Sequence, residues 1–501
     1  MCLVLGPSTA HAQSVRKYVS SAEGERLKEQ KSLRFGKESK ARSGLLFKID
    51  DSKPDQTIIG FGASFLEAGM ECLNSLPAAK KQEVLRSLFS QRDGAGFSAM
   101  KTVIGATDFM SAGSFYTYDD TPGDLPLAKF SIQRDLQSNG LIPFIKSAQR
   151  YGHFVLEAPM DYPPDWMLFD VNSNQDVAPK YYDALSRYYA RYLQDYQKNG
   201  IEINYLSLFN EPSIYTKIPY EQIRDLLADH VGPLFLQLGI KARLQMAEAP
   251  SRAQALDEYP KVLDDPKARK FVSALPYHGY DFTAFKAGPI DSPKAIRVEP
   301  TKENGYNFSE FQAILALHRR YPDLPLWMTE VCLFNFGTPW AKPLPRLEFE
   351  YGDLFGRQIF ADVKAGASGW IYWNMILDQD GGPELISPVH RDSADNKQQP
   401  LVVINRQSGE VSFTGAYYYL AHFSKFVRPG YVRLEVLDGT KDFLSSIQAD
   451  VQGLAFKGPN GAVVAELINS KRSTEKVRIN WRDREMNVEL PAQSITTLTW
   501  K

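Results

Sequence analysis

Two glutamates stand at the ends of apolar segments, a placement that suits acid–base and nucleophilic chemistry. Glu211 closes the segment LSLFNEP, and Glu330 closes the segment PLWMTEV. Hydrolysis of a glycosidic bond needs such a pair, because one carboxylic acid protonates the leaving oxygen while one carboxylate attacks the anomeric carbon. A retaining enzyme holds the two groups about 5–5.5 Å apart, since no water stands between nucleophile and sugar.

A single glutamate among 59 acidic residues is more often a solvated surface charge. Two glutamates at the ends of apolar segments, each beside aromatic residues, are harder to explain in that way. The apolar neighbours Phe209 and Pro212 favour a proton on Glu211, whereas Glu330 must stay ionised to attack. Asn210 could donate a hydrogen bond to the sugar 2-hydroxyl. The sequence therefore predicts Glu211 as acid/base and Glu330 as nucleophile.

The elements that position these residues alternate between short apolar runs and helix-period segments. Segments such as 181–200 and 307–322 have the length and period of crossover helices. Between residues 57 and 427 this pattern predicts an α/β fold, a (β/α)8 TIM barrel whose active site lies at the C-terminal ends of the strands. A doubly wound open sheet usually carries a glycine-rich phosphate loop, which the sequence lacks. The eight predicted strands begin at Ile58, Ala99, His153, Ile203, Lys241, Phe271, Pro325 and Ser368.

A different pattern begins near Tyr431, where short strands are separated by turn signals. The stretch before Asp51 is also strand-like and could pair with them. Residues 30–56 and 428–501 are therefore predicted to form a smaller β-sandwich domain. The predicted C-terminal strands are YVRLEVL, FLSSIQA, the two halves of GLAFKGPNGAVVAELIN, KVRINW and SITTLTW.

Composition limits the partners and the location. Lys and Arg total 58 against 59 for Asp and Glu, so no long-range field attracts nucleic acid or an anionic membrane. A neutral carbohydrate is the expected partner, and no apolar run approaches the ~20 residues of a membrane span. Residues 1–12 end in Ala10-His11-Ala12 and predict a clipped signal peptide, hence a periplasmic or secreted protein.

Metal chemistry is not favoured by the sequence. The seven histidines are scattered, with no HxH or HxxxH pair, whereas a metal-dependent barrel hydrolase needs clustered ligands at strand ends. Two of the three cysteines, Cys72 and Cys332, lie beyond the predicted signal peptide and cannot make a structural zinc site. We expect no metal and no cofactor.

Longer motifs resemble glycoside hydrolase family 30, the glucosylceramidase (acid β-glucosidase) family, from Ile59 to the C-terminus. The resemblance implies a barrel with a side β-sandwich built from both chain ends, no cofactor, and retention through a covalent glycosyl-enzyme. The motifs are GFGASFLEA, SFYTYDDTPGDLPLAKFSI, LSLFNEPS, HGY, WMTEVC, GWIYWNMILDQDGGP and YYYLAHFSKFVRPG.

The resemblance also implies roles for individual residues. It supports Glu211 as acid/base and Glu330 as nucleophile, and matches Asp108 to an aspartate that binds the outer sugar hydroxyls. The residues implied to line the −1 sugar site are Asn210, His278, Tyr280 and Trp373.

Three departures from the family concern the substrate. Lys101 stands where glucosylceramidases have an arginine, which exchanges a bidentate group for a point charge. The sequence Met160-Asp161-Tyr162 replaces a tryptophan after the third strand, and Glu384 replaces an asparagine after GGP. Lys101 and Glu384 are therefore predicted to contact a sugar that differs from that of glucosylceramide.

The leading interpretation is a retaining β-glycoside hydrolase acting on β-glucosides or on a β-1,6-linked glucan or galactan. A true glucosylceramidase is an alternative, which should show an apolar surface around the barrel mouth. A carbohydrate-binding relative that has lost catalysis is another, although the chain keeps both Glu211 and Glu330.

Overall fold

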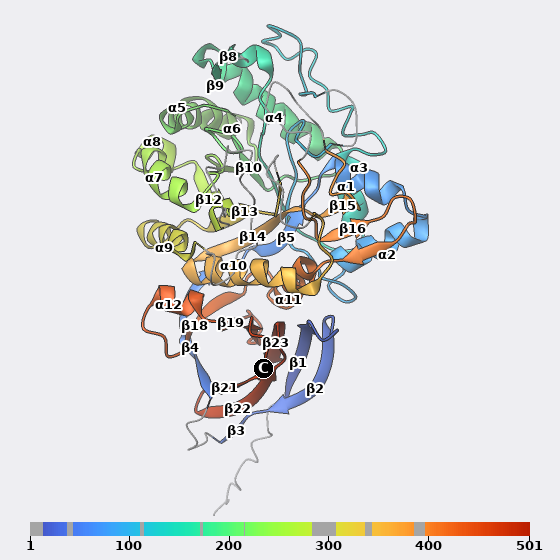
Figure 1. Cartoon of the computed structure of the whole chain (residues 1–501). Helices are drawn as coiled ribbons and strands as arrows, with labels where there is room; N and C mark the ends of the chain where they lie inside the picture. The colour runs from blue at the N-terminus through green and yellow to red at the C-terminus, as the bar shows by residue number, and fades with distance from the viewer. Residues whose placement is uncertain are drawn as a thin grey trace, which may run out of the picture. The chain divides into compact units, whose positions relative to one another are not determined.

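The computed structural model describes residues 14–37, 44–110, 115–170, 174–214, 216–282, 307–335, 343–384 and 396–501. The chain divides into two compact units. One unit is made from the two chain ends, up to Asp55 and from Gly430 onward, and the other runs from Gln56 to Pro429. Figure 1 shows both units.

The larger unit is a closed barrel of eight parallel strands (Figure 1). Each strand lies in one of the eight apolar runs, so the predicted (β/α)8 barrel is confirmed. In order around the barrel the strands are β5 (Gly60–Ser64), β6 (Ala99–Lys101), β7 (Val155–Ala158), β10 (Tyr205–Ser207), β11 (Arg243–Gln245), β12 (Val272–His278), β13 (Leu326–Glu330) and β14 (Ala367–Asn374).

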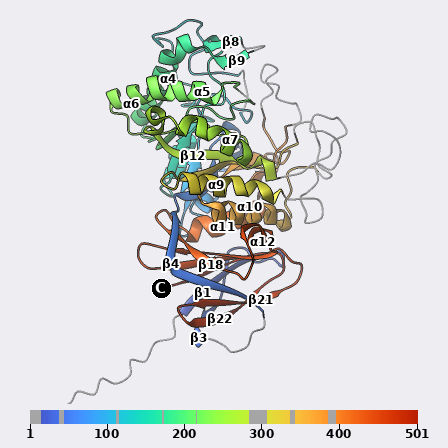
Figure 2. The ribbon, with the colours of Figure 1, turned by 90° about the vertical axis from the view of Figure 1, so that its left-hand side faces the viewer.

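Helices surround these strands, and α7, α9, α10 and α11 follow one another side by side in both views (Figure 2). The two helical segments used in the sequence argument correspond to α4 and α9. The helices are α1 (Glu67–Asn74), α2 (Ala78–Phe89), α3 (Leu141–Gln149), α4 (Tyr182–Lys198), α5 (Tyr220–Asp225), α6 (Gly232–Leu238), α7 (Arg252–Leu263), α8 (Pro266–Arg269), α9 (Phe311–Arg320), α10 (Gly352–Ala365) and α11 (Gly415–Phe426). Two small sheets add β8 (Leu168–Asp170) to β9 (Asn174–Val177), and β15 (Ile376–Asp378) to β16 (Val402–Ile404) and β17 (Val411–Phe413).

The barrel interior changes from apolar to polar along the strands. One buried layer consists of Ala99, Tyr205, Ala274, Trp327 and Ile371. Side chains two residues further along a strand point to the same face. The next layer therefore contains Lys101, Ser207, Thr329 and Trp373, and all four side chains are buried. The chemistry-bearing residues stand on this polar layer, above a rigid apolar one.

The smaller unit is a ten-stranded sheet that folds into a β-sandwich. The rings of Trp481 and Trp500 lie 5.6 Å apart although their strands are not neighbours in the sheet, so the sheet folds over one core. In sheet order the strands are β2 (Lys28–Arg34), β1 (Ser14–Ser21), β23 (Ser494–Trp500), β20 (Val463–Asn469), β19 (Val451–Lys457), β18 (Val432–Leu437), β4 (Leu45–Thr57), β21 (Glu475–Trp481), β22 (Arg484–Leu490) and β3 (Gly36–Lys37).

Two details of the sandwich differ from the sequence prediction. The segment FLSSIQA is not a strand, because Phe443–Gln448 form helix α12, whose N-terminus is capped by Asp442 accepting a hydrogen bond from the Ser445 amide at 2.8 Å. The sheet also begins with β1 at Ser14, earlier than residue 30, and pairs β1 with the last strand of the chain. The predicted signal peptide, residues 1–12, lies outside the described residues.

No helix in the described part of the chain has the length and apolar character needed to cross a membrane.

A buried aspartate organises the tyrosine-rich side of the barrel unit. Asp135 is fully buried and accepts hydrogen bonds from the hydroxyls of Tyr118 at 2.5 Å, Tyr196 at 2.6 Å and Tyr116 at 3.0 Å. Burial raises the pKa of Asp135 to about 6, although the three hydroxyls act to lower it. The carboxyl group therefore ties α4 to the segment before α3.

We expect Asp135→Ala to lower the free energy of unfolding by about 3 kcal/mol or more, because the tyrosine hydroxyls lose their shared acceptor inside the protein. Urea denaturation would measure the change. Asp257→Ala, on the exposed face of α7, is the control and should shift stability by less than about 0.5 kcal/mol. Equal midpoints for the two variants would contradict the structural role of Asp135.

Candidate active site

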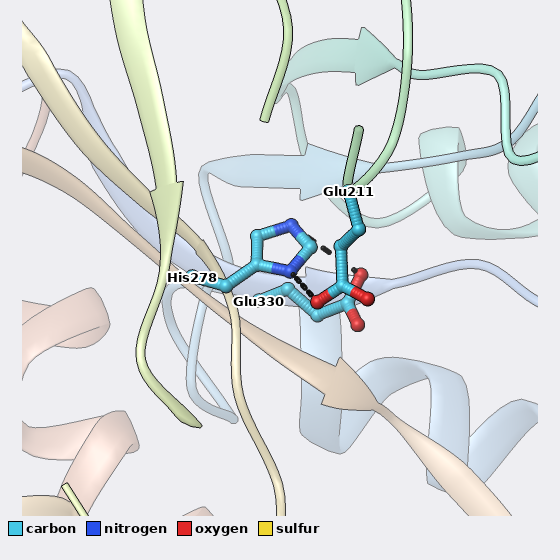
Figure 3. Close-up of side chains that lie close together, drawn as sticks. All are labelled: Glu211, His278 and Glu330. Carbon is cyan, nitrogen blue, oxygen red and sulfur yellow. Dashed lines mark hydrogen bonds and ion pairs between the residues drawn. The ribbon is translucent and has the colours of Figure 1, made fainter. Parts of the chain in front are cut away.

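The two glutamates meet at the mouth of the barrel. Glu330 is the last residue of β13, and Glu211 lies four positions beyond the end of β10. A carboxylate oxygen of Glu211, a carboxylate oxygen of Glu330 and a ring nitrogen of His278 all lie within 4.8 Å of one another. Figure 3 shows the three side chains converging, His278 from the end of β12, Glu330 from the end of β13 and Glu211 from the loop after β10. Both carboxyl groups are therefore close enough to act on the same bond.

The backbone at Glu211 has an unusual conformation. Its φ of +44° lies in the left-handed region, which costs a residue with a Cβ about 1 kcal/mol or more. Neighbouring strand ends hold it there: the Glu211 amide donates to the Glu248 carbonyl at 3.0 Å, and the Asn210 amide donates to the Met160 carbonyl at 2.7 Å. The fixed turn directs the Glu211 side chain at the site.

Glu211 is paired with a histidine. His278 Nδ1 lies 2.7 Å from Glu211 Oε1, and both side chains are buried. Burial raises the pKa of Glu211, and the hydrogen bond and charge of His278 only partly offset that effect. Glu211 can thus hold a proton above the usual range of a carboxylic acid, as a general acid must.

His278 itself carries charge. Burial acts to lower its pKa, but the surrounding carboxylates of Glu330, Glu211 and Glu248 outweigh burial and raise it to about 10. Both ring nitrogens then donate, Nδ1 to Glu211 and Nε2 to Glu248 Oε2 at 3.0 Å.

Glu330 is held by one cation and one hydroxyl. Lys101 Nζ donates to Glu330 Oε2 at 2.8 Å, and the Tyr280 hydroxyl donates to Glu330 Oε1 at 2.8 Å. Lys101 Nζ also lies 3.3 Å from Asn210 Oδ1 and 5.1 Å from the centre of a Trp373 ring. These contacts fix the orientation of the Glu330 carboxyl group, as a nucleophile requires.

The sequence analysis missed Glu248, which joins the two halves of the site. Its Oε2 accepts hydrogen bonds from Lys101 Nζ at 2.8 Å, Thr329 Oγ1 at 2.7 Å and His278 Nε2. Burial acts to raise the pKa of Glu248, but Lys101 and His278 lower it to about 2. Glu248 lies three residues beyond the end of β11, much as Glu211 lies four residues beyond the end of β10, so its position after the strand indicates a place at the barrel mouth.

Asp108 and Glu384 each have a protein partner outside the catalytic pair. Asp108 accepts a hydrogen bond from Asn396 Nδ2 at 2.9 Å, and Glu384 is 2.6 Å from Lys397 Nζ. Asn396 and Lys397 are adjacent in the chain, so both acids contact the same segment. Asn396 in turn accepts from Gln398 Nε2 at 3.1 Å. The structure thus brings seven of the nine predicted site residues into one cluster and leaves these two on a neighbouring network.

The cluster could be considered as a metal site, because Glu211, His278 and Glu330 offer three ligand atoms within 4.8 Å of one another. Both His278 nitrogens already contact carboxylates, however, and the Lys101 ammonium already neutralises Glu330. A divalent ion would have to displace these hydrogen bonds. The arrangement therefore suits proton transfer and carboxylate attack without a metal.

Comparison with protein families adds two matches. The model of the glycosyl hydrolase family 30 TIM-barrel domain matches residues 58–289 and 302–427. The model of the glycosyl hydrolase family 30 beta sandwich domain matches residues 438–498. Together they cover the barrel and the C-terminal part of the sandwich.

Curated relatives carry two kinds of name. The chain is 24% identical over 523 residues to the lysosomal acid glucosylceramidase of Mus musculus, covering 100% of this chain and 92% of that protein. It is 25% identical over 446 residues to the endo-1,6-beta-D-glucanase of Neurospora crassa, covering 85% of this chain and 82% of that protein.

Solved structures share the fold. SrfJ from Salmonella typhimurium superposes with a TM-score of 0.81 at 22% identity, covering 97% of this chain and 99% of that one. The endo-beta1,6-glucanase BT3312 superposes with a TM-score of 0.76 at 21% identity and the same coverage.

We expect Glu248→Gln to lower the free energy of unfolding by about 3 kcal/mol near pH 6, because it removes one anion from between two buried cations. The pKa of His278, about 10 in the folded protein, lies above its ordinary value of 6.5. Its charge therefore stabilises the fold fully below pH 6.5, and that contribution is lost as the pH rises through 10.

The stability difference between parent and Glu248→Gln should accordingly shrink between pH 6 and pH 10 when measured by urea unfolding. Glu410→Gln, an exposed control, should match the parent at both values. A gap that does not change with pH would show that Glu248 does not act through the charge of His278.

Proposed function

The chain belongs to glycosyl hydrolase family 30 and is a β-glycoside hydrolase, and we propose that it retains configuration, with Glu330 as nucleophile and Glu211 as acid/base. The observation that carries this proposal is the 4.8 Å limit on the separation of their carboxylate oxygens. An inverting enzyme needs about 6.5–9.5 Å between the groups to admit a water.

In the first step a Glu330 oxygen attacks the anomeric carbon while Glu211 gives its proton to the leaving oxygen. In the second step Glu211, now a carboxylate, removes a proton from water, which displaces Glu330 from the glycosyl ester. As Glu330 loses its charge on esterification, Lys101 keeps its 2.8 Å bond to Glu248 and remains in place. The nucleophile can therefore become neutral without releasing the cation beside it.

For the substrate we propose a β-1,6-linked glucan. The names of the Neurospora crassa relative and of BT3312 support this choice, as do the departures from glucosylceramidases at Lys101, Asp161 and Glu384. In this proposal Asn210, His278, Tyr280, Trp373 and Lys101 line the −1 sugar site, and Asp108 and Glu384 contact groups further out.

Glucosylceramide is the second candidate. The name of the mouse relative supports it, and so does Ile214, which lies three residues beyond Glu211 with 53% of its surface exposed. An apolar side chain in that place could contact a lipid tail.

We further propose that the protein acts outside the cytoplasm. The signal-peptide pattern of residues 1–12 supports export.

Purified protein should release sugar from one member of a panel of β-1,6-glucan, β-1,3-glucan, aryl β-glycosides and glucosylceramide micelles. We expect Glu330→Gln to reduce kcat on that member by about 10⁴-fold or more, because no other group can form the glycosyl ester. Reducing-end assays and chromatography would measure release.

Glu410→Gln is the matched control and should leave turnover unchanged. Preference for glucosylceramide over β-1,6-glucan would reverse the order of the two substrate proposals. Equal turnover by parent and Glu330→Gln would refute the assignment of the nucleophile.

The pH profile should report the proton on Glu211. Burial raises its pKa above the ordinary 4.5, so the acid form persists to higher pH and kcat/KM falls on the alkaline side as that proton is lost. We expect Glu211→Ala to lower kcat/KM by about 10²–10⁴-fold on substrates with poor leaving groups. With a dinitrophenyl glycoside the loss should be much smaller and the alkaline fall should disappear. An unchanged alkaline limb in this variant would assign that limb to another group.

A further inference from the structure

We propose that Asp161 is a specificity-determining residue, whose carboxyl group binds one hydroxyl of the sugar held between Glu211 and Glu330. This inference rests on the proposed glycosidase function and names a contact of that same site. It concerns a side chain that has no role in the two chemical steps described above.

Asp161 lies at the rim of the barrel among the catalytic strands. It follows the end of β7 by three residues, and the neighbours of β7 are β6, which carries Lys101, and β10, which leads to Glu211. Backbone hydrogen bonds join the residues just before Asp161 to the segments that follow β6 and β10. The Pro159 carbonyl accepts from the Ile104 amide at 2.9 Å, on the β6 side, and the Met160 carbonyl accepts from the Asn210 amide on the β10 side.

The carboxyl group of Asp161 is buried without a protein partner. Only 3% of the residue is exposed, and its Oδ1 is fully buried yet makes no hydrogen bond to the protein. Buried polar atoms are almost always hydrogen-bonded, since an unpaired one loses its water without compensation. A substrate hydroxyl would supply the missing partner of Asp161 Oδ1, whereas Glu248, whose Oε1 is also unpaired, already accepts three hydrogen bonds at Oε2.

Charge balance favours a neutral hydroxyl over a cationic sugar. Lys101 and His278 are the cations of the cluster. Lys101 contacts Glu248 and Glu330, and His278 contacts Glu248 and Glu211. With the proton that the acid/base role assigns to Glu211, two positive and two negative charges remain, and they cancel.

Burial raises the pKa of Asp161 well above its ordinary value and so favours the neutral form of the carboxyl group. Such a group has one donor and one acceptor, as a hydroxyl does. Sugar hydroxyls therefore match both its charge and its hydrogen-bonding pattern.

The test is a double-mutant cycle between the side chain and the sugar. Parent and Asp161→Ala are compared on the aryl β-glycoside that the parent cleaves fastest and on its 2-, 3-, 4- and 6-deoxy analogues. For one deoxy position, kcat/KM of the parent should fall about 10-fold or more relative to the full sugar. Asp161→Ala should lose a similar factor in kcat/KM on the full sugar. The variant should then cleave that deoxy analogue and the full sugar with equal kcat/KM. Asp161→Asn keeps a donor and an acceptor and should restore most of the discrimination.

The same comparison is made by calorimetric binding in the Glu330→Gln background, which needs no turnover. If no catalytic activity were found, that result would count against the proposed function. The binding measurement would still test the role of Asp161. The inference would be overturned if Asp161→Ala lowered kcat/KM or affinity equally for every analogue, or left both within 2-fold of the parent. Circular dichroism and urea unfolding would separate the first of these outcomes from simple misfolding, with Asp257→Ala as the surface control.

Discussion

Two buried cations, Lys101 and His278, hold the carboxylates of this barrel mouth together. Like charges about 4 Å apart repel by about 4 kcal/mol at an effective dielectric of about 20, so Glu211, Glu248 and Glu330 could not share the site without compensation. Each cation bridges two of these acids, and Glu248 is common to both bridges. Burial favours the proton on Glu211, and the Lys101 ammonium, 2.8 Å from Glu330, balances the charge that Glu330 needs as nucleophile. Three features of the fold place these side chains within hydrogen-bonding distance of one another. They are the lengths of the strands, the turn after β10 and the polar layer of the barrel interior.

Much of this could be predicted from sequence because the barrel repeats one unit. The eight apolar runs mark the strands, and a polar residue at the end of such a run points into the mouth, which locates Glu211, Glu330 and His278. Glu248 was missed because it lies inside the predicted run KARLQMAEA and not after it. The short helix α12 was mistaken for a strand because its six residues are too few to show a helical period, although the Asp442 cap was present in the sequence. The first strand was missed because its alternation directly follows the apolar N-terminal run.

Pair contacts could not be predicted, since they depend on which side chains of distant strands reach one another. The sequence predicts that Asp108 and Glu384 contact the sugar, and the structure adds that Asn396 and Lys397 are their protein partners. The local sequence around each acid does not indicate its partner. Asn396 follows Asp108 by almost three hundred residues, and Lys397 follows Glu384 by thirteen. Gln398 links this network to the barrel, because it accepts hydrogen bonds from Asn374 at the end of β14 and from Cys332 beyond β13.

The left-handed backbone of Glu211 has a consequence for how such proteins evolve. A glycine adopts this conformation without the steric cost of a Cβ, and it would also remove a carboxyl group from the protein interior. Glycine would relieve the backbone strain, but it would leave His278 Nδ1 without the acceptor that now lies 2.7 Å away. The conformation of the turn and the ion pair of its side chain are therefore linked, and a substitution that relieves one gives up the other. Position 211 should accept few residues besides glutamate even where turnover is no longer selected.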